Sequence, residues 1–546
     1  MLNTFLSQIV LLFCILGYSG LFKKFIHPNN ILNVENIDII YGYLFLTSIS
    51  IMFNFFIPLK FISKEVLILG VLLFIYFVFK KNYNINFYTL FITCFFLIFI
   101  THEQGISYDS QLYHLQTIQL NYNYKTIFGI GNLQPHYGMN SSWHSLVSLF
   151  NYDFLNTRFI YLVNISLFCF FINEIFKKDF FSKKRISDFF LILSIFYIIS
   201  YSYFHPYGNG TILNSLGSPE VDTVAMVFFI LCVYLFLLFM ENKEINHLYL
   251  FFSLIFLVIT IKISYVGVFL FFIYTVYKNI KNFFLNRIIF FLSFSSFIWF
   301  LKSIFLTGCF IFPIKYSCFQ TTWSMNSKEV ETYGNIIQSF ARDTPLRLKF
   351  TDFEFMLNST QWIIPWFKEY FVQTEFLFIS FLIILINLLI LILIYGLKFF
   401  STNINIQKYH FITLLILLLN LIVWFRAPEI RFGYGSIISL VAISSSMVLL
   451  DVKLKFINKI FLYTIFILLI IPITIKNKEN FKNITNQSFV RDFNYSTFKV
   501  IYTAGNYKVY TPTKNNFCNA FEGLCTYQGY KVDIINKDNH LFMKRN

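Results

Sequence analysis

Long apolar runs alternate with short polar breaks along most of this 546-residue chain. A helix that crosses the ~30 Å hydrocarbon core of a bilayer needs about 20 mostly apolar residues. The pattern therefore predicts an all-α polytopic membrane protein with about 12–14 transmembrane helices. The expected apolar segments are roughly 3–22, 37–58, 65–79, 86–101, 155–176, 187–204, 221–240, 248–261, 264–277, 285–307, 373–397, 409–425, 434–450 and 458–475.

Basic residues gather in every second polar break, at Lys23-Lys24, Lys80-Lys81, Lys177 to Arg185, Lys278 to Arg287, Lys398 to Lys408 and Lys453 to Lys459. The positive-inside rule places these clusters in the cytoplasm and the N-terminus outside. The outer segments are then 102–154, 205–220, 308–372, 426–433 and 476–546. We expect a transmembrane domain over 1–475 and a small extracytoplasmic C-terminal domain over 476–546.

Residues 248–277 depart from this regular pattern. The stretches "LYLFFSLIFLVIT" and "SYVGVFLFFIYTVY" are each short for a membrane span, and only "IKI" separates them. Lys262 in the middle is costly in a membrane unless it faces a cavity, an interface or an anionic partner. We therefore treat Lys262 as a functional candidate.

Composition supports the membrane assignment. The chain is 57% hydrophobic and only 13% charged, with a mean hydropathy of +0.63. The formal net charge of +16 is explained by basic cytoplasmic loops, so we expect no nucleic-acid partner. The lipid bilayer is the expected environment.

The eight cysteines fall into two groups. Four lie inside expected spans, at Cys14, Cys94, Cys169 and Cys232. The others form two local pairs on the predicted outer side, where oxidising conditions favour disulfides. We expect bonds within the pairs Cys309 and Cys318, and Cys518 and Cys525, with unpaired thiols as the alternative.

The first outer segment begins with "GISYDSQLYHLQTIQLNYN" directly after an apolar run. Its apolar positions recur at helical spacing, which predicts an interfacial helix on the membrane surface. Asp109 near its start is a candidate functional residue, with the alternative that it merely caps the helix. Glu220 and Asp222 in "GSPEVD" are further functional candidates. The alternative is that they cap the span that begins near Val221.

Several motifs resemble those of a known protein group: "YDSQLYHLQTIQ", "GNLQPHYGMNSSW", "GSPEVDTVAMVF", "TIKISY", "KSIFLTGCFIFPI", "RAPEIRFGYG" and "TPTKNNFCNAFEGLCT". Over residues 102–526 they are similar to a family of mostly uncharacterised bacterial multi-pass membrane proteins with the architecture of the GT-C glycosyltransferase superfamily. One departure follows "GNL", where a histidine and an arginine are usual and this chain has Gln134-Pro135-His136-Tyr137.

The resemblance implies transfer of a sugar from a polyprenyl-phosphate carrier to an envelope glycan, lipid or protein acceptor at the outer face of a bacterial inner membrane. Asp109 would be the catalytic carboxylate, as the inverting GT-C mechanism implies. The expected substrate-binding residues are Tyr108, Tyr113, His114, Glu220, Asp222, Lys262, Arg426 and Arg431, and Lys302 is also expected near the outer boundary. No motif indicates a metal site, although a divalent metal is compatible with the departure of a phosphate.

Two other functions remain open at this stage. A transporter or flippase of a lipid-linked glycan would have a similar number of spans and buried cations. Such proteins usually show paired repeats and broken helices, and the sequence shows no symmetry between its halves. An envelope scaffold without chemistry would leave Lys262 and the boundary acids unexplained.

Overall fold

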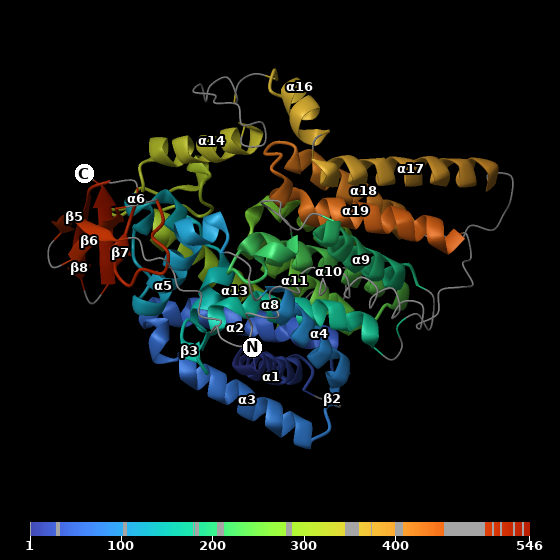
Figure 1. Cartoon of the computed structure of the whole chain (residues 1–546), viewed down its shortest axis with the longest axis horizontal. Coiled ribbons are helices and arrows are strands. Elements are labelled where there is room, and N and C mark those ends of the chain that lie inside the picture. Colours follow the sequence, from blue (N-terminus) through green and yellow to red (C-terminus); the bar gives the residue numbers. More distant parts are fainter. Residues whose placement is uncertain are drawn as a thin grey trace.

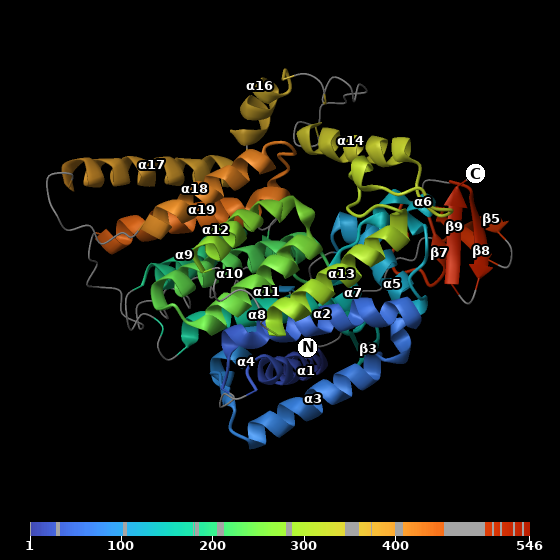
Figure 2. The same ribbon diagram turned by 180° about the vertical axis from the view of Figure 1, so that it is seen from behind.

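A computed structural model gives the arrangement of the helices and strands (Figures 1 and 2). It describes residues 2–28, 33–101, 106–177, 180, 185–204, 212–279, 287–343, 357, 360–372, 374–398, 408–451, 497–504, 507–513, 516–527, 530–537 and 540–545.

Helices form the bulk of these residues, as the apolar pattern predicts. Each expected segment up to 434–450 coincides with a helix, and 458–475 lies outside the described residues. The helices are α1 (Leu2–Ile26), α2 (Ile39–Phe56), α3 (Ser63–Phe79), α4 (Phe87–Thr101), α5 (Leu115–Asn123), α6 (Ile130–Leu133), α7 (Ser142–Ser148), α8 (Val163–Asn173), α9 (Ile186–Phe204), α10 (Val221–Asn242), α11 (Ile245–Ile261), α12 (Phe269–Asn279), α13 (Arg287–Thr307), α14 (Ser327–Asp343), α16 (Ile363–Pro365), α17 (Glu375–Lys398), α18 (Lys408–Trp424) and α19 (Ile430–Asp451).

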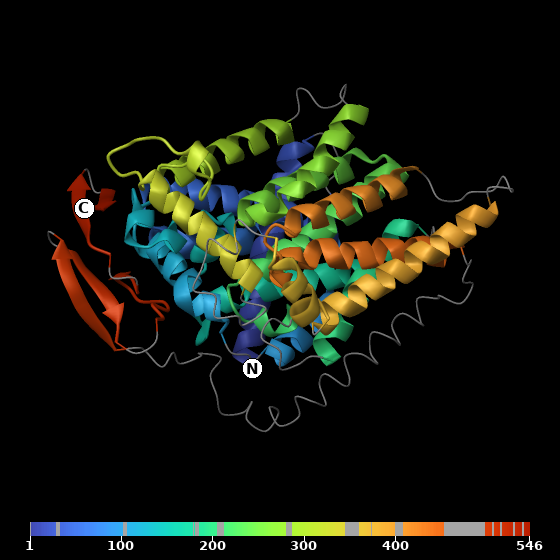
Figure 3. The same cartoon turned by 90° about the horizontal axis from the view of Figure 1, so that it is seen from above.

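Seven of the described helical segments are long and apolar enough to cross a membrane: Leu2–Ile26, Asn36–Phe56, Phe159–Phe176, Val221–Asn242, Arg287–Thr307, Glu375–Leu393 and Ile430–Leu449. Shorter apolar helices accompany them, including α4, α9, α11 and α18. The chain is thus a multi-pass membrane protein. Helix α10 occupies the centre, because its most apolar window is fully buried, whereas α17 lies along one side of the bundle (Figure 3).

Two residues of the basic clusters, Lys23 and Lys177, lie at the same end of the bundle. Lys23 pairs with Asp38 at 2.5 Å, and Asn246 at the start of α11 donates to the same carboxylate. Lys177 pairs with Glu174 at 2.7 Å. Asn36, two residues before Asp38, donates a hydrogen bond to the same glutamate at 3.2 Å. The ends of α1 and α8 and the beginnings of α2 and α11 therefore lie together, as the charge alternation predicts for these spans. Which end faces the cytoplasm stays a prediction.

Strands form only a small part of the fold. Two strand pairs, β1 (Val34–Glu35) with β2 (Tyr83–Asn84) and β3 (Asp153–Phe154) with β4 (Thr157–Arg158), are two residues long. The C-terminal region holds β5 (Phe498–Ala504), β6 (Tyr507–Pro512), β7 (Leu524–Cys525), β8 (Val532–Lys537) and β9 (His540–Arg545), with sheet order β5-β6-β7 beside the hairpin β8-β9. An all-α description thus needs a small C-terminal strand region added.

The C-terminal strands pack on the first loop, at the edge of the molecule beside α5 and α6 (Figure 1). Phe128 pairs with Phe542 in an isolated β-bridge, and the Tyr137 hydroxyl donates to the Cys525 carbonyl at 2.8 Å. Both expected disulfides are present, Cys309–Cys318 and Cys518–Cys525. The tail therefore closes over the segment that begins with Asp109.

The expected interfacial helix is instead buried in protein. The π-helical turn Ser110–His114 leads directly into α5, and Leu112, Leu115 and Ile118 are at most 8% exposed. Their apolar face contacts α7 rather than lipid. An amphipathic pattern predicts that one face of a helix is covered but does not say whether lipid or protein covers it. The expected position of this helix on the membrane surface was therefore wrong.

Candidate functional site

Charged side chains from four separate parts of the chain meet where spans end. They come from the start of the first loop, the beginning of α10, the end of α11 and the beginning of α19. The cluster consists of Asp109, Glu220, Asp222, Lys262, Glu429 and Arg431, and we call it the charged cluster. Five of these residues are expected from the sequence alone.

Arg431 contacts all four acidic side chains of the charged cluster. Its Nη1 lies 2.7 Å from Asp109 Oδ2 and 3.7 Å from both Glu220 Oε1 and Asp222 Oδ2. Its Nε lies 3.3 Å from Glu429 Oε1. A planar guanidinium offers donors in several fixed directions, so one arginine can hold several carboxylates.

Lys262 provides the second cation. It ends α11, and the chain continues through the 3-10 segment Ile263–Val268 after a residue with extended backbone. Its ammonium forms an ion pair with Asp222 and lies 4.0 Å from the centroid of the Phe432 ring. The anionic partner that makes a membrane lysine tolerable is therefore Asp222.

Neither Asp109 nor Glu220 acts as a simple helix cap. Both stand at N-terminal helix positions, yet neither side chain makes a capping hydrogen bond. The cap beside Asp109 comes from Ser107, whose Oγ accepts from the Ser110 backbone amide at 3.3 Å. The carboxylates are thus left for the charged cluster.

A hydroxyl network beside Asp109 joins the start of the first loop to the residues that precede α10. Ser107 donates to Ser110 Oγ at 2.8 Å, and Ser218 donates to the same oxygen at 2.7 Å. Asn164 then binds the carbonyls of Ser218 and Glu220 at 2.8 and 2.9 Å. Trp143, a residue typical of membrane interfaces, is instead fully buried and donates to Asn164 Oδ1 at 2.8 Å.

Carboxylates outnumber cations in the charged cluster, four to two. Burial, and next the neighbouring carboxylate of Asp222, raise the pKa of Glu220 to about 8. Burial also raises the pKa of Glu429. Glu220 is therefore largely protonated at neutral pH, and the raised pKa of Glu429 further reduces the negative charge of the cluster. Within the described ranges, no three His, Cys, Asp or Glu side chains are arranged to hold a metal ion.

Aromatic rings and neutral histidines border Asp109. Tyr113 packs on His114 and on His136, with ring centroids 4.3 and 4.7 Å apart. His136 also contacts Tyr333 of α14 and lies 3.1 Å from the Tyr527 hydroxyl in the tail. Burial lowers the pKa of His114 to about 3 and that of His136 to about 4, so both are uncharged at neutral pH.

Two predicted residues lie at the margin or outside this arrangement. Tyr108 is 62% exposed and meets Phe517 of the tail edge-to-face at 5.2 Å. Arg426 is exposed, and its backbone carbonyl accepts from Arg342 at 3.2 Å. Its side chain joins no ion pair in the part of the chain that the structure describes.

The sequence reasoning missed Glu429, Tyr333 and Tyr527 as site residues. Glu429 stands two positions before Arg431 in "RAPEIRFGYG", so its proximity to a candidate cation was a usable signal. Tyr333 and Tyr527 come from α14 and the tail, and only the tertiary fold brings them to His136.

Comparison with known proteins gives one match. No curated protein and no solved structure matches the chain. A protein-family model described as "Domain of unknown function (DUF8201)" matches residues 1–438, which include the whole charged cluster. The chain therefore belongs to the DUF8201 family.

Proposed function

We propose that this protein is a membrane glycosyltransferase of the GT-C type. It would move a sugar from a polyprenyl-phosphate carrier to an envelope glycan, lipid or protein acceptor at the outer face of the bacterial inner membrane. The observation that carries the proposal is the position of Asp109 and its contact with Arg431. This acid follows a span, does not cap its helix, and is held partly exposed by Arg431 among further carboxylates.

In this proposal Asp109 is the general base. Arg431 binds Oδ2, so Oδ1 is oriented to accept the proton of an acceptor hydroxyl. The acceptor oxygen bonds to the anomeric carbon, the bond from that carbon to the carrier phosphate breaks, and the configuration inverts. General-base catalysis of this kind contributes about 10²–10⁴ in rate.

In this proposal Arg431 and Lys262 position carboxylates and do not bind the carrier phosphate. Both cations already pair with carboxylates, so a phosphate would have to compete with these carboxylates for them. Arg431 would orient Asp109, and Lys262 would orient Asp222. The sugar ring would lie against the wall formed by Tyr113, His114 and His136.

A deletion strain complemented with variants tests this function. Asp109→Asn keeps the size of the side chain and removes its charge. We expect loss of one surface glycan or glycolipid product with normal protein level, as measured by untargeted mass spectrometry of glycolipids and surface glycans. Asp153→Asn is the matched control, because Asp153 lies in the same loop with a side chain 59% exposed. Full product with Asp109→Asn would refute the proposal.

One observation favours a second function. The spans α11 and α12 are joined by an extended break at Lys262, and broken helices around charged groups are typical of transporters. A flippase for a lipid-linked glycan would accumulate the complete glycan on the cytoplasmic leaflet when inactivated. A transferase would accumulate the donor and lack its product.

A further inference from the structure

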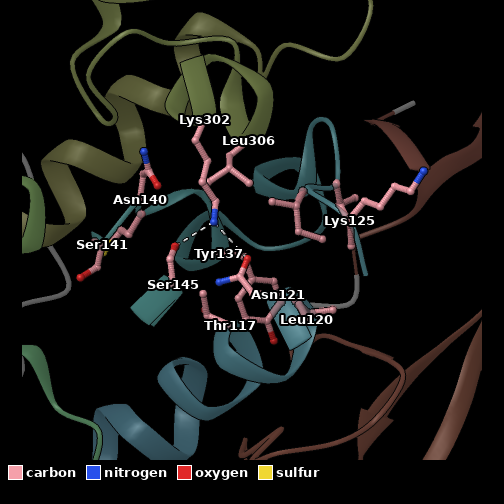
Figure 4. Close-up of a pocket in the computed structure, with 13 residues that line it drawn as sticks. Thr117, Leu120, Asn121, Lys125, Tyr137, Asn140, Ser141, Ser145, Lys302 and Leu306 are labelled. Carbon is pink, nitrogen blue, oxygen red and sulfur yellow. Dashed lines mark hydrogen bonds between the residues drawn. The ribbon is translucent and has the colours of Figure 1, made fainter. Parts of the chain in front are cut away.

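Lys302 is a buried amine apart from the charged cluster. It lies near the C-terminal end of α13 and its side chain is 2% exposed. Its Nζ donates to Ser145 Oγ at 2.9 Å and to the Oδ1 atoms of Asn54 and Asn121, each at 3.3 Å (Figure 4). All three acceptors are neutral, so these contacts offer the ammonium no counter-charge.

A cavity of about 30 Å³ adjoins this amine. Its lining contains no carboxylate and consists of Thr117, Leu120, Asn121, Lys125, Ile127, Ile130, Tyr137, Met139, Asn140, Ser141, Ser145, Lys302 and Leu306. A cavity of this size has room for roughly two water molecules. The space is therefore small, and the charged side chains in its lining are those of two lysines, Lys125 and Lys302.

Polar atoms around the cavity lack partners. Asn140 Oδ1 and Ser141 Oγ are buried without a hydrogen-bond partner among the described residues. The same holds for both ring nitrogens of the neighbouring His144, whose pKa is lowered by burial, then by His114 and Lys302. Buried polar groups without partners commonly mark a missing water or ligand.

A buried charge is tolerated when it is paired, because desolvation without a counter-ion is expensive. We propose that the Lys302 pocket binds the phosphate group of a small anion or of a lipid headgroup. Lys302 supplies the charge, and the Ser145 hydroxyl supplies a neutral contact. This binding does not depend on the sugar-transfer reaction.

An isosteric substitution gives a direct test. Asn121→Asp places a carboxylate where the amide oxygen lies 3.3 Å from the Lys302 ammonium. This internal counter-ion should raise the melting temperature without ligand and should remove the response to phosphate. Asn123→Asp is the matched control, because it adds the same charge to the same helix away from Lys302. A bound phosphate would take over the ammonium donor that now reaches Asn121 at 3.3 Å. Lys302→Met should therefore weaken phosphate binding ~10- to 100-fold, the loss of one charge-assisted hydrogen bond.

The measurement is thermal unfolding of the full chain against inorganic phosphate, with chloride at equal ionic strength. A second arm compares nanodiscs of phosphatidylcholine with and without phosphatidic acid. A saturable rise that needs Lys302 supports the proposal, and the arm that shows it identifies a free anion or a headgroup. Absence of a rise in both arms overturns it. So does a rise that survives both Asn121→Asp and Lys302→Met. Sugar transfer is not read out, so failure here leaves the proposed function intact.

Discussion

The side chain of Asp109 is held by one ion pair and is still partly accessible to solvent. Arg431 takes a single carboxylate oxygen at 2.7 Å, and the side chain of Asp109 remains 24% exposed. No hydrogen bond among the described residues occupies its second oxygen. A carboxylate held at both oxygens by one arginine would be a structural pair. The one-sided contact leaves Oδ1 available, as the proposed general-base role requires.

Glu220 makes stability depend on pH near neutrality. Its pKa in the folded protein is about 8 rather than 4.5, because burial and the carboxylates of Asp222 and Asp109 outweigh Arg431 and Lys262. Between these values the folded state binds the extra proton, so stability falls as pH rises. We expect Glu220→Gln to melt at progressively higher temperature than wild type from pH 5 to pH 8. Melting curves with a constant difference would contradict this.

Among the helices, the break between α11 and α12 brings Lys262 into contact with Asp222. The sequence predicted the break, because "IKI" interrupts an apolar run, and it predicted that Lys262 needs an anionic partner. It did not indicate which acid, since Asp222 is forty residues away. Local pattern thus locates functional elements, whereas their pairing depends on how the helices pack.

Breaking this pair should be more harmful than removing it. Lys262→Met leaves Asp222 buried at the start of α10 without its nearest cation, and breaking a buried pair costs about 3–5 kcal/mol. The double variant Lys262→Met with Asp222→Asn should recover much of this loss. Denaturant or thermal unfolding of both single variants and the double variant measures the coupling. Lys60→Met, at an exposed site, is the control. Additive effects would show that the pair is not coupled.

At the scale of the whole molecule, the sequence predicts most of the architecture. Apolar length located the described spans, and the alternation of charge placed Asp109, Glu220, Lys262 and Arg431 at one boundary. The contacts of Tyr333 and Tyr527 with His136 could not be predicted, because such contacts depend on long-range packing. The buried face of α5 was misassigned for a related reason, since lipid and protein cover an apolar face equally well.

Accessibility labelling tests the predicted orientation. The four free cysteines, Cys14, Cys94, Cys169 and Cys232, are buried and can be replaced by alanine as a background. We expect a membrane-impermeant thiol reagent to label Thr332→Cys in α14 on intact cells. Glu244→Cys, at the opposite end before α11, should react only after the membrane is opened. The reverse pattern would invert the whole topology.

The most direct test of the account measures where carrier-linked sugar accumulates when Asp109 is neutralised. Right-side-out membrane vesicles from cells with Asp109→Asn and with Asp153→Asn are treated with a membrane-impermeant oxidant, and lipid-linked sugars are quantified by mass spectrometry. If Asp109 acts in sugar transfer, the Asp109→Asn vesicles carry an excess of donor on the outer face, open to oxidation, together with loss of the transferred product. An excess that is protected on the inner face, or no excess with normal product, would contradict a role for Asp109 in sugar transfer.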